Sequence, residues 1–243
     1  MSASAGLRDL LPVLDPSAHD YLQFHIRRYQ FLLNVIAGIF DKRESAEQAQ
    51  IRILDVGMSF ETALLQEAHP SAVVDTLGYF DHRFTSLVRG HHTNFDLNHA
   101  DSPAAWPVLE PYDLVVMAEV IEHLHVAPLH VLRCASTWLR PGGTLLIQTP
   151  NPVSLGKRWS LLRGRNPFEM IREDPTNPGH FCEYTPDDLR TLGQRGGFEI
   201  SGLWLRNYFG QGGAANWIYS SLCNILPGPM HDGITIVFRK PHV

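Results

Sequence analysis

Two carboxylates and an imidazole follow an apolar stretch at a spacing that could let them act together. Residues 112–118 read YDLVVMA, and Glu119, Glu122 and His123 come after them. On a helical turn, positions i, i+3 and i+4 share one face, so these side chains could bind a divalent cation, with His180 as a fourth ligand. Such a cation would hold a hydroxyl group, lower its pKa and place its oxygen for reaction.

The same residues allow two interpretations without a metal. His123 or His180 could act as a general base, because imidazole titrates near neutral pH. Alternatively, the glutamates cap backbone amides and the histidines pack against their neighbours. The spacing alone leaves all three interpretations open.

A second candidate site lies in the stretch ILDVGMSFET, residues 53–62. An apolar strand runs into Asp55 and Gly57, as a nucleotide-binding turn begins. Gly57 lets the backbone approach a ligand closely, and the helix start that follows offers unpaired N–H groups. Ser59 and Glu61 stand where a cofactor loop usually carries glycine. The turn also lacks G-x-G-x-x-G, so a nicotinamide cofactor is not expected.

Short apolar stretches alternate with helical patterns along most of the chain. This alternation predicts a parallel sheet covered by helices on both faces. The expected helices are 17–40, 61–69, 126–139 and 185–196, and the expected strands are 51–56, 72–78, 92–97, 112–118, 143–149, 198–209 and 233–240. The long connection 150–184 and an insertion over 207–232 interrupt this pattern.

The bulk properties bound the class of protein. The chain has 243 residues with 44% hydrophobic and 19% charged side chains, which is an ordinary globular composition. A net charge of −5 argues against a general nucleic-acid binder. The chain has three widely spaced cysteines and no recognisable secretion signal, which predicts a soluble, cytoplasmic protein. Its longest apolar stretch has only ten residues (31–40), so no membrane span is expected.

Two segments carry a family resemblance. The stretch YDLVVMAEVIEHLHVAPLHVLRCASTWLRPGGTLLIQTPNP (112–152) and the stretch GHFCEYTPDDLRTLGQRGGFEI (179–200) are similar to class I S-adenosylmethionine-dependent methyltransferases of the ubiquinone-biosynthesis-like group, which act on small molecules. The resemblance extends from Tyr21 to Lys240. It implies an α/β fold with a Rossmann-like, seven-stranded, mostly parallel sheet whose last strand is antiparallel. Residues 1–50 would form a helical extension or lid, and 51–243 the methyltransferase domain.

The resemblance also assigns a cofactor to the turn after the first strand. S-adenosylmethionine would bind through the backbone of Asp55–Gly57, with Ser59 or Glu61 on the methionine part and Glu119 nearby. In the alternative, the bulk of Ser59 and Glu61 closes the pocket, and the chain is an inactive binding or scaffold protein.

Acidic residues after the second and third strands would hold the adenosine. Asp81, with Tyr79 beside it, is expected to accept from the ribose hydroxyls, and Asp75, in mid-strand, is the alternative. Asp96 and Leu97 resemble the family's adenine contact.

The substrate side is less specific. Tyr21, His25 and Tyr29 share one face of the first helix, which often covers the substrate in this family, although they could equally form a core stripe. The basic stretch KRWSLLRGR (157–165) could meet an anion or a membrane surface, or form a solvated edge. Trp217 and Tyr219 could line the pocket or simply be buried.

The resemblance implies methyl transfer to a small-molecule acceptor, with oxygen as the expected target atom. The pattern of Glu119, Glu122, His123 and His180 also resembles the magnesium site of ubiquinone O-methyltransferases and small-RNA 2′-O-methyltransferases. A metal-dependent RNA 2′-O-methyltransferase is therefore a further alternative. Nucleic acid is the less expected partner because of the net negative charge. The sequence is silent on oligomeric state.

Overall fold

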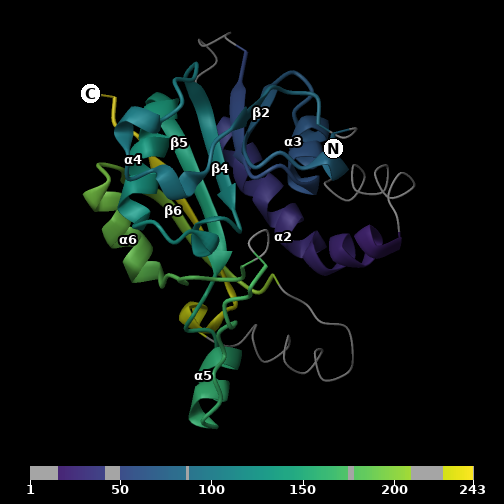
Figure 1. Cartoon of the computed structure of the whole chain (residues 1–243), viewed down its shortest axis with the longest axis vertical. Coiled ribbons are helices and arrows are strands. Elements are labelled where there is room, and N and C mark those ends of the chain that lie inside the picture. Colours follow the sequence, from purple (N-terminus) through teal and green to yellow (C-terminus); the bar gives the residue numbers. More distant parts are fainter. Residues whose placement is uncertain (1–15, 42–49, 86–87, 175–177, 209–226, 243) are drawn as a thin grey trace.

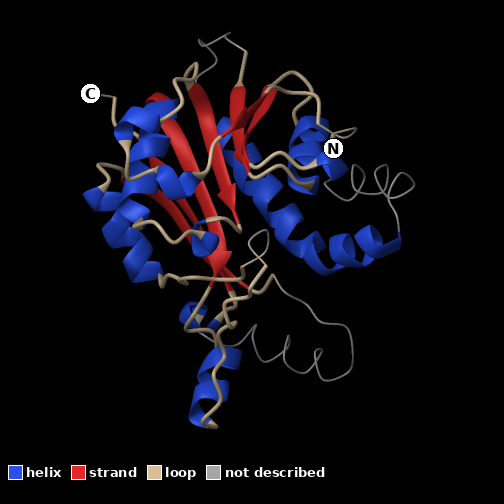
Figure 2. Ribbon diagram, in the orientation of Figure 1, coloured by secondary structure: helices blue, strands red, loops and turns tan. Residues whose placement is uncertain are grey.

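A single twisted sheet forms the centre of the molecule, with helices on both faces (Figure 2). The computed structural model describes residues 16–41, 50–85, 88–174, 178–208 and 227–242. The strands are β1 (Arg52–Val56), β2 (Val73–Gly78), β3 (His92–Asn94), β4 (Tyr112–Ala118), β5 (Leu139–Pro150), β6 (Glu199–Arg206) and β7 (Gly233–Arg239). Their order is β3-β2-β1-β4-β5-β7-β6, and β7 runs antiparallel to both neighbours. This confirms the expected Rossmann-like, mostly parallel sheet with an antiparallel last strand.

The helices are labelled in Figure 1. They are α2 (Pro16–Phe40), α3 (Phe60–Ala68), α4 (Pro128–Trp138), α5 (Leu155–Leu162) and α6 (Pro186–Arg195), with 3-10 turns η2 (His82–Phe84), η3 (Leu97–His99), η4 (Pro103–Ala105), η5 (Ile121–His123) and η6 (Gly228–Met230). None of the described helices is both long and apolar enough to cross a membrane.

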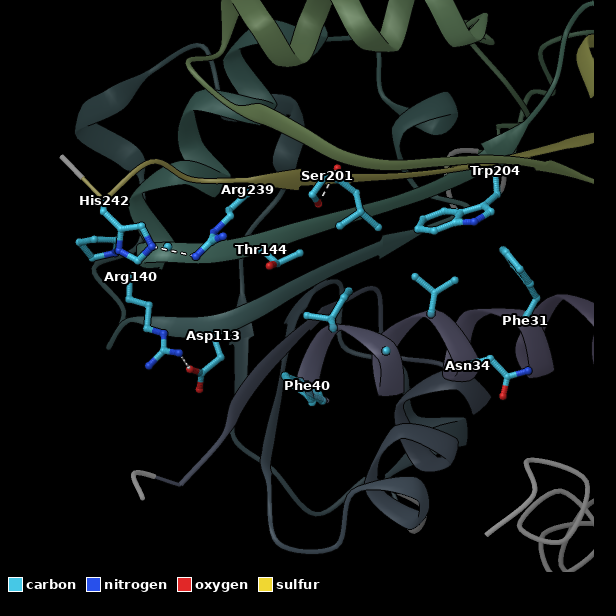
Figure 3. Close-up of a pocket in the computed structure, with 16 residues that line it drawn as sticks. Phe31, Asn34, Phe40, Asp113, Arg140, Thr144, Ser201, Trp204, Arg239 and His242 are labelled. Carbon is cyan, nitrogen blue, oxygen red and sulfur yellow. Dashed lines mark hydrogen bonds and ion pairs between the residues drawn. The ribbon is translucent and has the colours of Figure 1, made fainter. Parts of the chain in front are cut away.

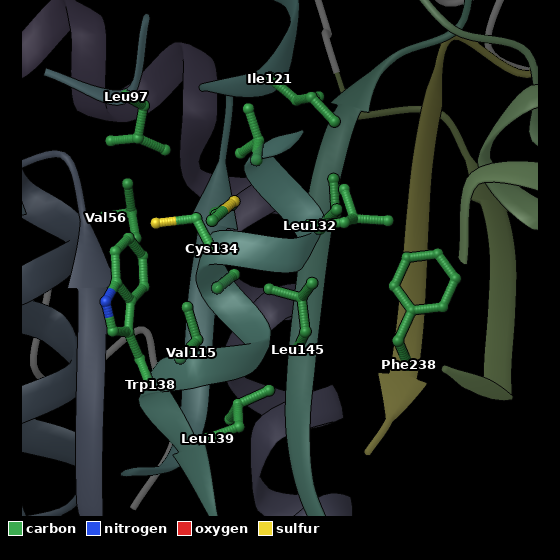
Figure 4. Packing of buried hydrophobic residues seen from close by; sticks show 14 of the residues in the cluster. Val56, Leu97, Val115, Ile121, Leu132, Cys134, Trp138, Leu139, Leu145 and Phe238 are labelled. Atoms are coloured by element: carbon green, nitrogen blue, oxygen red, sulfur yellow. The ribbon is translucent and has the colours of Figure 1, made fainter. Parts of the chain in front are cut away.

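One face of the sheet packs against α4 and α6. Trp138, Leu132 and Cys134 of α4 lie over Val115 and Leu145 of the sheet (Figure 4). All five are almost fully buried, and the Trp138 indole nitrogen donates to the backbone oxygen of Pro107 at 3.2 Å. Burial of this apolar surface is the main stabilising term on this side of the molecule.

The opposite face packs against α2 and α3. Leu22, Leu33 and Ile36 recur at helical spacing along α2 and share a core cluster with Ile53 and Leu114 of the sheet. The described part of the expected N-terminal lid therefore packs directly on the sheet. The division at residue 50, and a lid role for the segment before it, stay predictions.

Some elements differ from the expected ones. β5 begins at Leu139 rather than 143, because Leu139 already pairs with Tyr112 of β4, and the turn Arg140–Gly143 forms an irregularity before the regular pairing resumes at Thr144. The connection 150–184 contains α5, which the sequence did not predict. Trp217 and Tyr219, expected either to line the pocket or to be buried, fall within residues 209–226, outside the described residues.

Candidate cofactor and catalytic site

The order of strands reverses between β1 and β4, and in open α/β sheets ligands bind at the carboxyl ends of the strands at such a point. Gly57 follows β1 with φ +95°, and Gly78 ends β2 with φ +133°. A Cβ added at Gly78 would lie 3.6 Å from the Gly57 nitrogen, so both backbones come close here. A ligand can therefore approach the main chain at this edge.

The turn after β1 is closed by its own side chains. The Ser59 hydroxyl accepts from the Glu61 N–H at 3.1 Å, which caps the start of α3. The Thr62 hydroxyl donates to Oδ2 of the buried Asp55 at 2.6 Å. Ser59 and Asp55 were both expected to contact the cofactor. In the structure their side chains form hydrogen bonds that stabilise the turn itself.

Arg28 of α2 lies beside this turn, and sequence reasoning did not identify it. Its guanidinium is 3% exposed and lies 3.4 Å from Oε2 of Glu61 and 3.3 Å from Oε1 of Gln148 on β5. Gln148 in turn donates to the Thr235 hydroxyl at 3.0 Å. A buried polar chain therefore runs from α2 through β5 to β7 and fixes the guanidinium at the crevice.

Three carboxyl groups surround this single guanidinium. Burial raises the pKa values of both Asp55 and Glu119 to about 7. Burial and the neighbouring Asp55 hold the pKa of Glu61 well above its usual range. Burial alone would lower the pKa of Arg28, but the neighbouring Tyr29, Glu119, Glu61 and Tyr21 raise it instead. Asp55 and Glu61 interact directly, so at neutral pH the pair retains a proton beside a permanent cation.

A pH dependence of stability follows from Asp55. Its folded pKa of about 7 is raised, so the stability that it contributes is lost as pH rises through 7. Histidines whose folded pKa is lowered, such as His25, bind more protons in the unfolded state and change stability in the opposite direction near pH 6.5. The Asp55→Asn variant keeps these histidines, so the contribution of Asp55 is the difference between the two proteins. We expect the free energy of unfolding of the wild type in urea, relative to that of Asp55→Asn, to fall as pH rises from 6 to 8, and a difference that does not change with pH would contradict the assignment.

The cluster has the donors and acceptors that an amino-acid head group needs. No N–H or hydroxyl group among the described residues donates to Oε1 of Glu61 or to Oε1 of Glu119, and both atoms are buried. Such acceptors fit an ammonium group, and the Arg28 guanidinium fits a carboxylate. Glu119 has a left-handed backbone, φ 57°, an uncommon and strained conformation for a non-glycine residue that is often found at functional sites. The residues present therefore fit the methionine part of S-adenosylmethionine.

The expected adenosine contacts lie farther along the same edge. Asp96 caps η3, accepting from the Asn98 N–H at 2.9 Å, and also accepts a hydrogen bond from the phenol of Tyr79. Burial and this contact raise the pKa of Tyr79 to about 12, although its ring is 68% exposed. Leu97 is buried and belongs to the core cluster with Val56 and Leu77.

The two candidate ribose acceptors differ in environment. Asp81 is partly exposed, but its carboxylate is held by Arg83, with a shortest contact of 2.6 Å. Asp75 is buried in mid-strand, where it accepts from the Tyr112 hydroxyl and the His91 N–H, both at 2.9 Å. Asp75 is thus occupied by structural contacts, whereas a ribose would compete at Asp81 with an exposed arginine.

Glu122, His123 and His180 come together beyond β4. One ligand atom of each lies within 4.8 Å of the others, and the imidazole rings meet edge to face with centroids 4.8 Å apart. Glu122 is fully buried, Thr149 donates to its Oε2 at 3.0 Å, and its Oε1 has no donor among the described residues. Glu119 is not part of this trio, because the turn η5 begins only at Ile121, so the expected shared helical face does not form.

Second contacts fix the state of both imidazoles. His123 Nδ1 lies 2.9 Å from the Gly179 carbonyl oxygen, and His180 Nδ1 lies 2.9 Å from Oε1 of Glu183, which is also paired with Lys157. Because a carbonyl or an ionised carboxylate only accepts, each Nδ1 carries the hydrogen, and Nε2 of the neutral ring has a free lone pair. Burial also lowers the pKa of His123, which keeps it neutral. Both Nε2 atoms can therefore accept a proton or a metal ion.

The aromatic residues expected at the substrate form one row on α2. The Tyr21 and His25 rings have centroids 4.4 Å apart, and His25 and Tyr29 follow at 6.2 Å. Tyr29 is buried, while Tyr21 is 47% exposed. The row thus runs from solvent to the core beside Arg28. Contact with a substrate stays a prediction.

A separate pocket of about 750 Å³ lies at the opposite, amino-terminal edge of the sheet, beneath the second half of α2 (Figure 3). Asp113 pairs with Arg140 at 2.7 Å at one end, and Trp204 and Phe31 line the other. None of the candidate cofactor, catalytic or metal residues lines this pocket.

Comparisons with known proteins agree with this arrangement. A family model described as a methyltransferase domain matches residues 24–201. A probable S-adenosylmethionine-dependent methyltransferase of Mycolicibacterium smegmatis is 31% identical over 122 residues, which cover 50% of this chain and 42% of that protein. The chain therefore spans less than half of that relative's length.

Two further relatives cover more of the chain. A ubiquinone biosynthesis O-methyltransferase of Ruegeria pomeroyi is 26% identical over 179 residues, covering 71% of this chain and 70% of that protein. The crystal structure of an N-methyltransferase from Bradyrhizobium japonicum, in complex with S-adenosyl-L-homocysteine, superposes with a TM-score of 0.54 at 16% identity, covering 99% of this chain and all of the other. The family model matches most of this chain, and the sheet has the strand order described above. The chain therefore belongs to the class I S-adenosylmethionine-dependent methyltransferases.

Proposed function

We propose that this chain transfers a methyl group from S-adenosylmethionine to an oxygen atom of a small molecule. The observation that carries the proposal is the placement of two sites on either side of the end of β4. Arg28 and Glu61 lie on one side, and Glu122, His123 and His180 lie on the other.

The first site would bind the amino-acid end of the cofactor. Arg28 would pair with its carboxylate, and the free oxygens of Glu61 and Glu119 would accept from its ammonium group. Gly57 would let the cofactor lie against the main chain, and Tyr79, Asp81, Asp96 and Leu97 would surround the adenosine. When bound, the cofactor supplies an electrophilic methyl group on a sulfonium.

The second site would prepare the acceptor. Nε2 of His123 or His180 would take the proton from an acceptor hydroxyl, whose oxygen then forms the new C–O bond as the S–C bond breaks. Glu122 would hold a neighbouring hydroxyl of the acceptor through its free Oε1. Proximity and alignment would supply most of the rate, because methyl transfer needs the oxygen, carbon and sulfur in line.

The trio also fits a divalent cation. Two imidazole nitrogens and one carboxylate are donors that Mn²⁺, Fe²⁺ or Zn²⁺ accepts more readily than Mg²⁺ does. The hydrogen bonds that the two Nδ1–H groups donate to the Gly179 carbonyl oxygen and to Glu183 are the usual support of ligating histidines. Bound there, a cation would lower the pKa of the acceptor hydroxyl.

Cation binding can be measured before the acceptor is known. We expect the wild-type protein to bind Mn²⁺ in calorimetry, and Glu122→Gln to bind it at least about tenfold more weakly, because a charged ligand is lost. Glu110→Gln, at an exposed position away from the trio, is the control. If the wild-type protein binds no Mn²⁺ or Zn²⁺, the metal interpretation fails and the histidines remain as bases.

The acceptor class is tested with labelled S-adenosylmethionine and a panel of phenols, catechols, carboxylic acids and amines. The proposal expects label in the oxygen nucleophiles and a loss of at least about a hundredfold in His180→Ala, as for removal of a general base. Label in amines alone would overturn the choice of oxygen.

A further inference from the structure

The segment 155–174 does not contribute to the core of the molecule. It contains α5 and the loop that follows, and α5 projects away from the sheet beyond its carboxyl edge (Figure 1). No residue of α5 is buried. A helix this short gains little stability of its own and normally depends on packing an apolar face. We call residues 155–174 the arm.

The arm nevertheless carries large apolar side chains, and they face solvent. Of the eleven exposed large apolar residues among the described ones, six fall within residues 159–171. They are Trp159 (58% exposed), Leu161 (54%), Leu162 (80%), Phe168 (41%), Met170 (79%) and Ile171 (60%). Single exposed apolar residues are ordinary, but such a concentration on one projecting segment indicates a contact surface.

The charge of the arm is opposite to that of the chain. The arm carries five basic and three acidic side chains, a net charge of +2, whereas the whole chain has a net charge of −5. The acidic ones, Glu169, Glu173 and Asp174, all lie in its second half, and residues 155–165 carry four basic and no acidic side chains. The basic residues are Lys157, Arg158, Arg163 and Arg165. Arg158, Arg163 and Arg165 are exposed, so their charge is available to an anionic partner.

The arm is also held in a defined shape. Arg158 donates to the Val153 carbonyl oxygen at 2.6 Å, and the Arg165 N–H donates to the Ser160 oxygen at 2.9 Å. Lys157 forms an ion pair with Glu183, the residue that also contacts His180. Glu183 thus links the arm, through Lys157, to the candidate catalytic residue His180.

We propose that the arm is a peripheral membrane anchor that seats the carboxyl edge of the sheet on an anionic lipid bilayer. Leu161, Leu162, Met170 and Ile171 would enter the acyl boundary, Trp159 would lie at the headgroup level, and the arginines would contact lipid phosphates. Aliphatic side chains gain burial in a bilayer but little on a nucleic-acid backbone, which favours lipid over RNA as the partner.

For the proposed function, membrane docking would give a lipid-soluble methyl acceptor a direct path to the catalytic residues. If the arm lies on a bilayer, an acceptor dissolved in the lipid can reach the trio of Glu122, His123 and His180 without crossing water. This consequence rests on the proposed function, whereas membrane docking itself does not.

The test is co-sedimentation of the full-length protein with phosphatidylcholine vesicles, with and without 30 mol% phosphatidylglycerol, at low and moderate salt. We expect binding to the anionic vesicles that weakens with salt. Leu161→Ser with Leu162→Ser, and separately Arg163→Glu with Arg165→Glu, should each weaken binding by more than about tenfold. Val108→Ser and Arg133→Glu, at exposed sites on other parts of the chain, are the matched controls and should bind as the wild type does.

Other outcomes overturn the proposal. Absence of binding to anionic vesicles, or binding unchanged by both arm variants, would show that the arm is not an anchor. Tight binding of single-stranded RNA that the arm variants abolish, without vesicle binding, would assign the arm to nucleic acid. A dimer in light scattering that Leu161→Ser with Leu162→Ser dissociates, again without vesicle binding, would assign it to a second copy. Cofactor binding should be unchanged in all arm variants, which separates this test from that of the proposed function.

Discussion

The Arg28→Met variant should bind S-adenosylhomocysteine at least about a hundredfold more weakly than the wild type, and it should also be less stable. The guanidinium is the cation around which Asp55, Glu61 and Glu119 are arranged, and it is 3% exposed. Removing one partner of a buried ionic cluster leaves the others uncompensated and costs about 3 to 5 kcal/mol. The loss of a charge-assisted contact to the ligand carboxylate adds to the loss of affinity.

The two effects can be separated by pH. The carboxyl groups of Asp55 and Glu119 have pKa values near 7, so at pH 6 they can hold protons and tolerate the missing cation better than at pH 8. Urea unfolding should therefore show a smaller difference between Arg28→Met and the wild type at pH 6. Arg27→Met, at the exposed neighbouring position, is the matched control. A folded Arg28→Met protein that binds the ligand normally at pH 6 would contradict the role of Arg28.

The Glu61→Gln variant should bind S-adenosylhomocysteine about tenfold more weakly, and its binding should release fewer protons. In the free protein burial and the neighbouring Asp55 hold the pKa of Glu61 well above its usual range, which favours its protonated form. Pairing with the ligand ammonium favours the ionised form, and the proton must then leave. Calorimetry in two buffers of different ionisation enthalpy measures that release.

Glu67→Gln is the control for Glu61, because it lies on the same helix but is exposed and paired with Arg89. Tighter binding by Glu61→Gln would reverse the assignment. Glu61 would then be an internal competitor for Arg28 that the ligand must displace, rather than a contact to its ammonium group.

Much of the fold could be predicted from the sequence because local signals agree with the tertiary structure. Apolar stretches such as 112–118 become buried strands. The helix expected over 185–196 becomes α6, and Thr185 with Asp188 forms the capping box at its start. The apolar periodicity of residues 17–40 becomes the buried face of α2.

The site was less predictable because it depends on contacts between distant segments. Arg28 looked like one of several helical basic residues, and only the packing of α2 on the sheet brings it beside Glu61, 33 positions away. Its position three residues after His25 on the same helix was the available signal. The spacing of Glu119, Glu122 and His123 suggested one helical face, but the left-handed backbone at Glu119 turns the chain before η5 begins.

Cofactor binding at the turn after β1 is the central claim, and one measurement tests it most directly. Calorimetry of the purified protein with S-adenosylhomocysteine, in magnesium and again in EDTA, should give micromolar binding in both conditions. That result would show that a turn with Ser59 and Glu61 in place of glycine binds the cofactor through Arg28 and the Gly57 backbone. Absence of binding in both conditions by a folded protein would contradict the claim and would favour a scaffold that keeps the fold without the reaction.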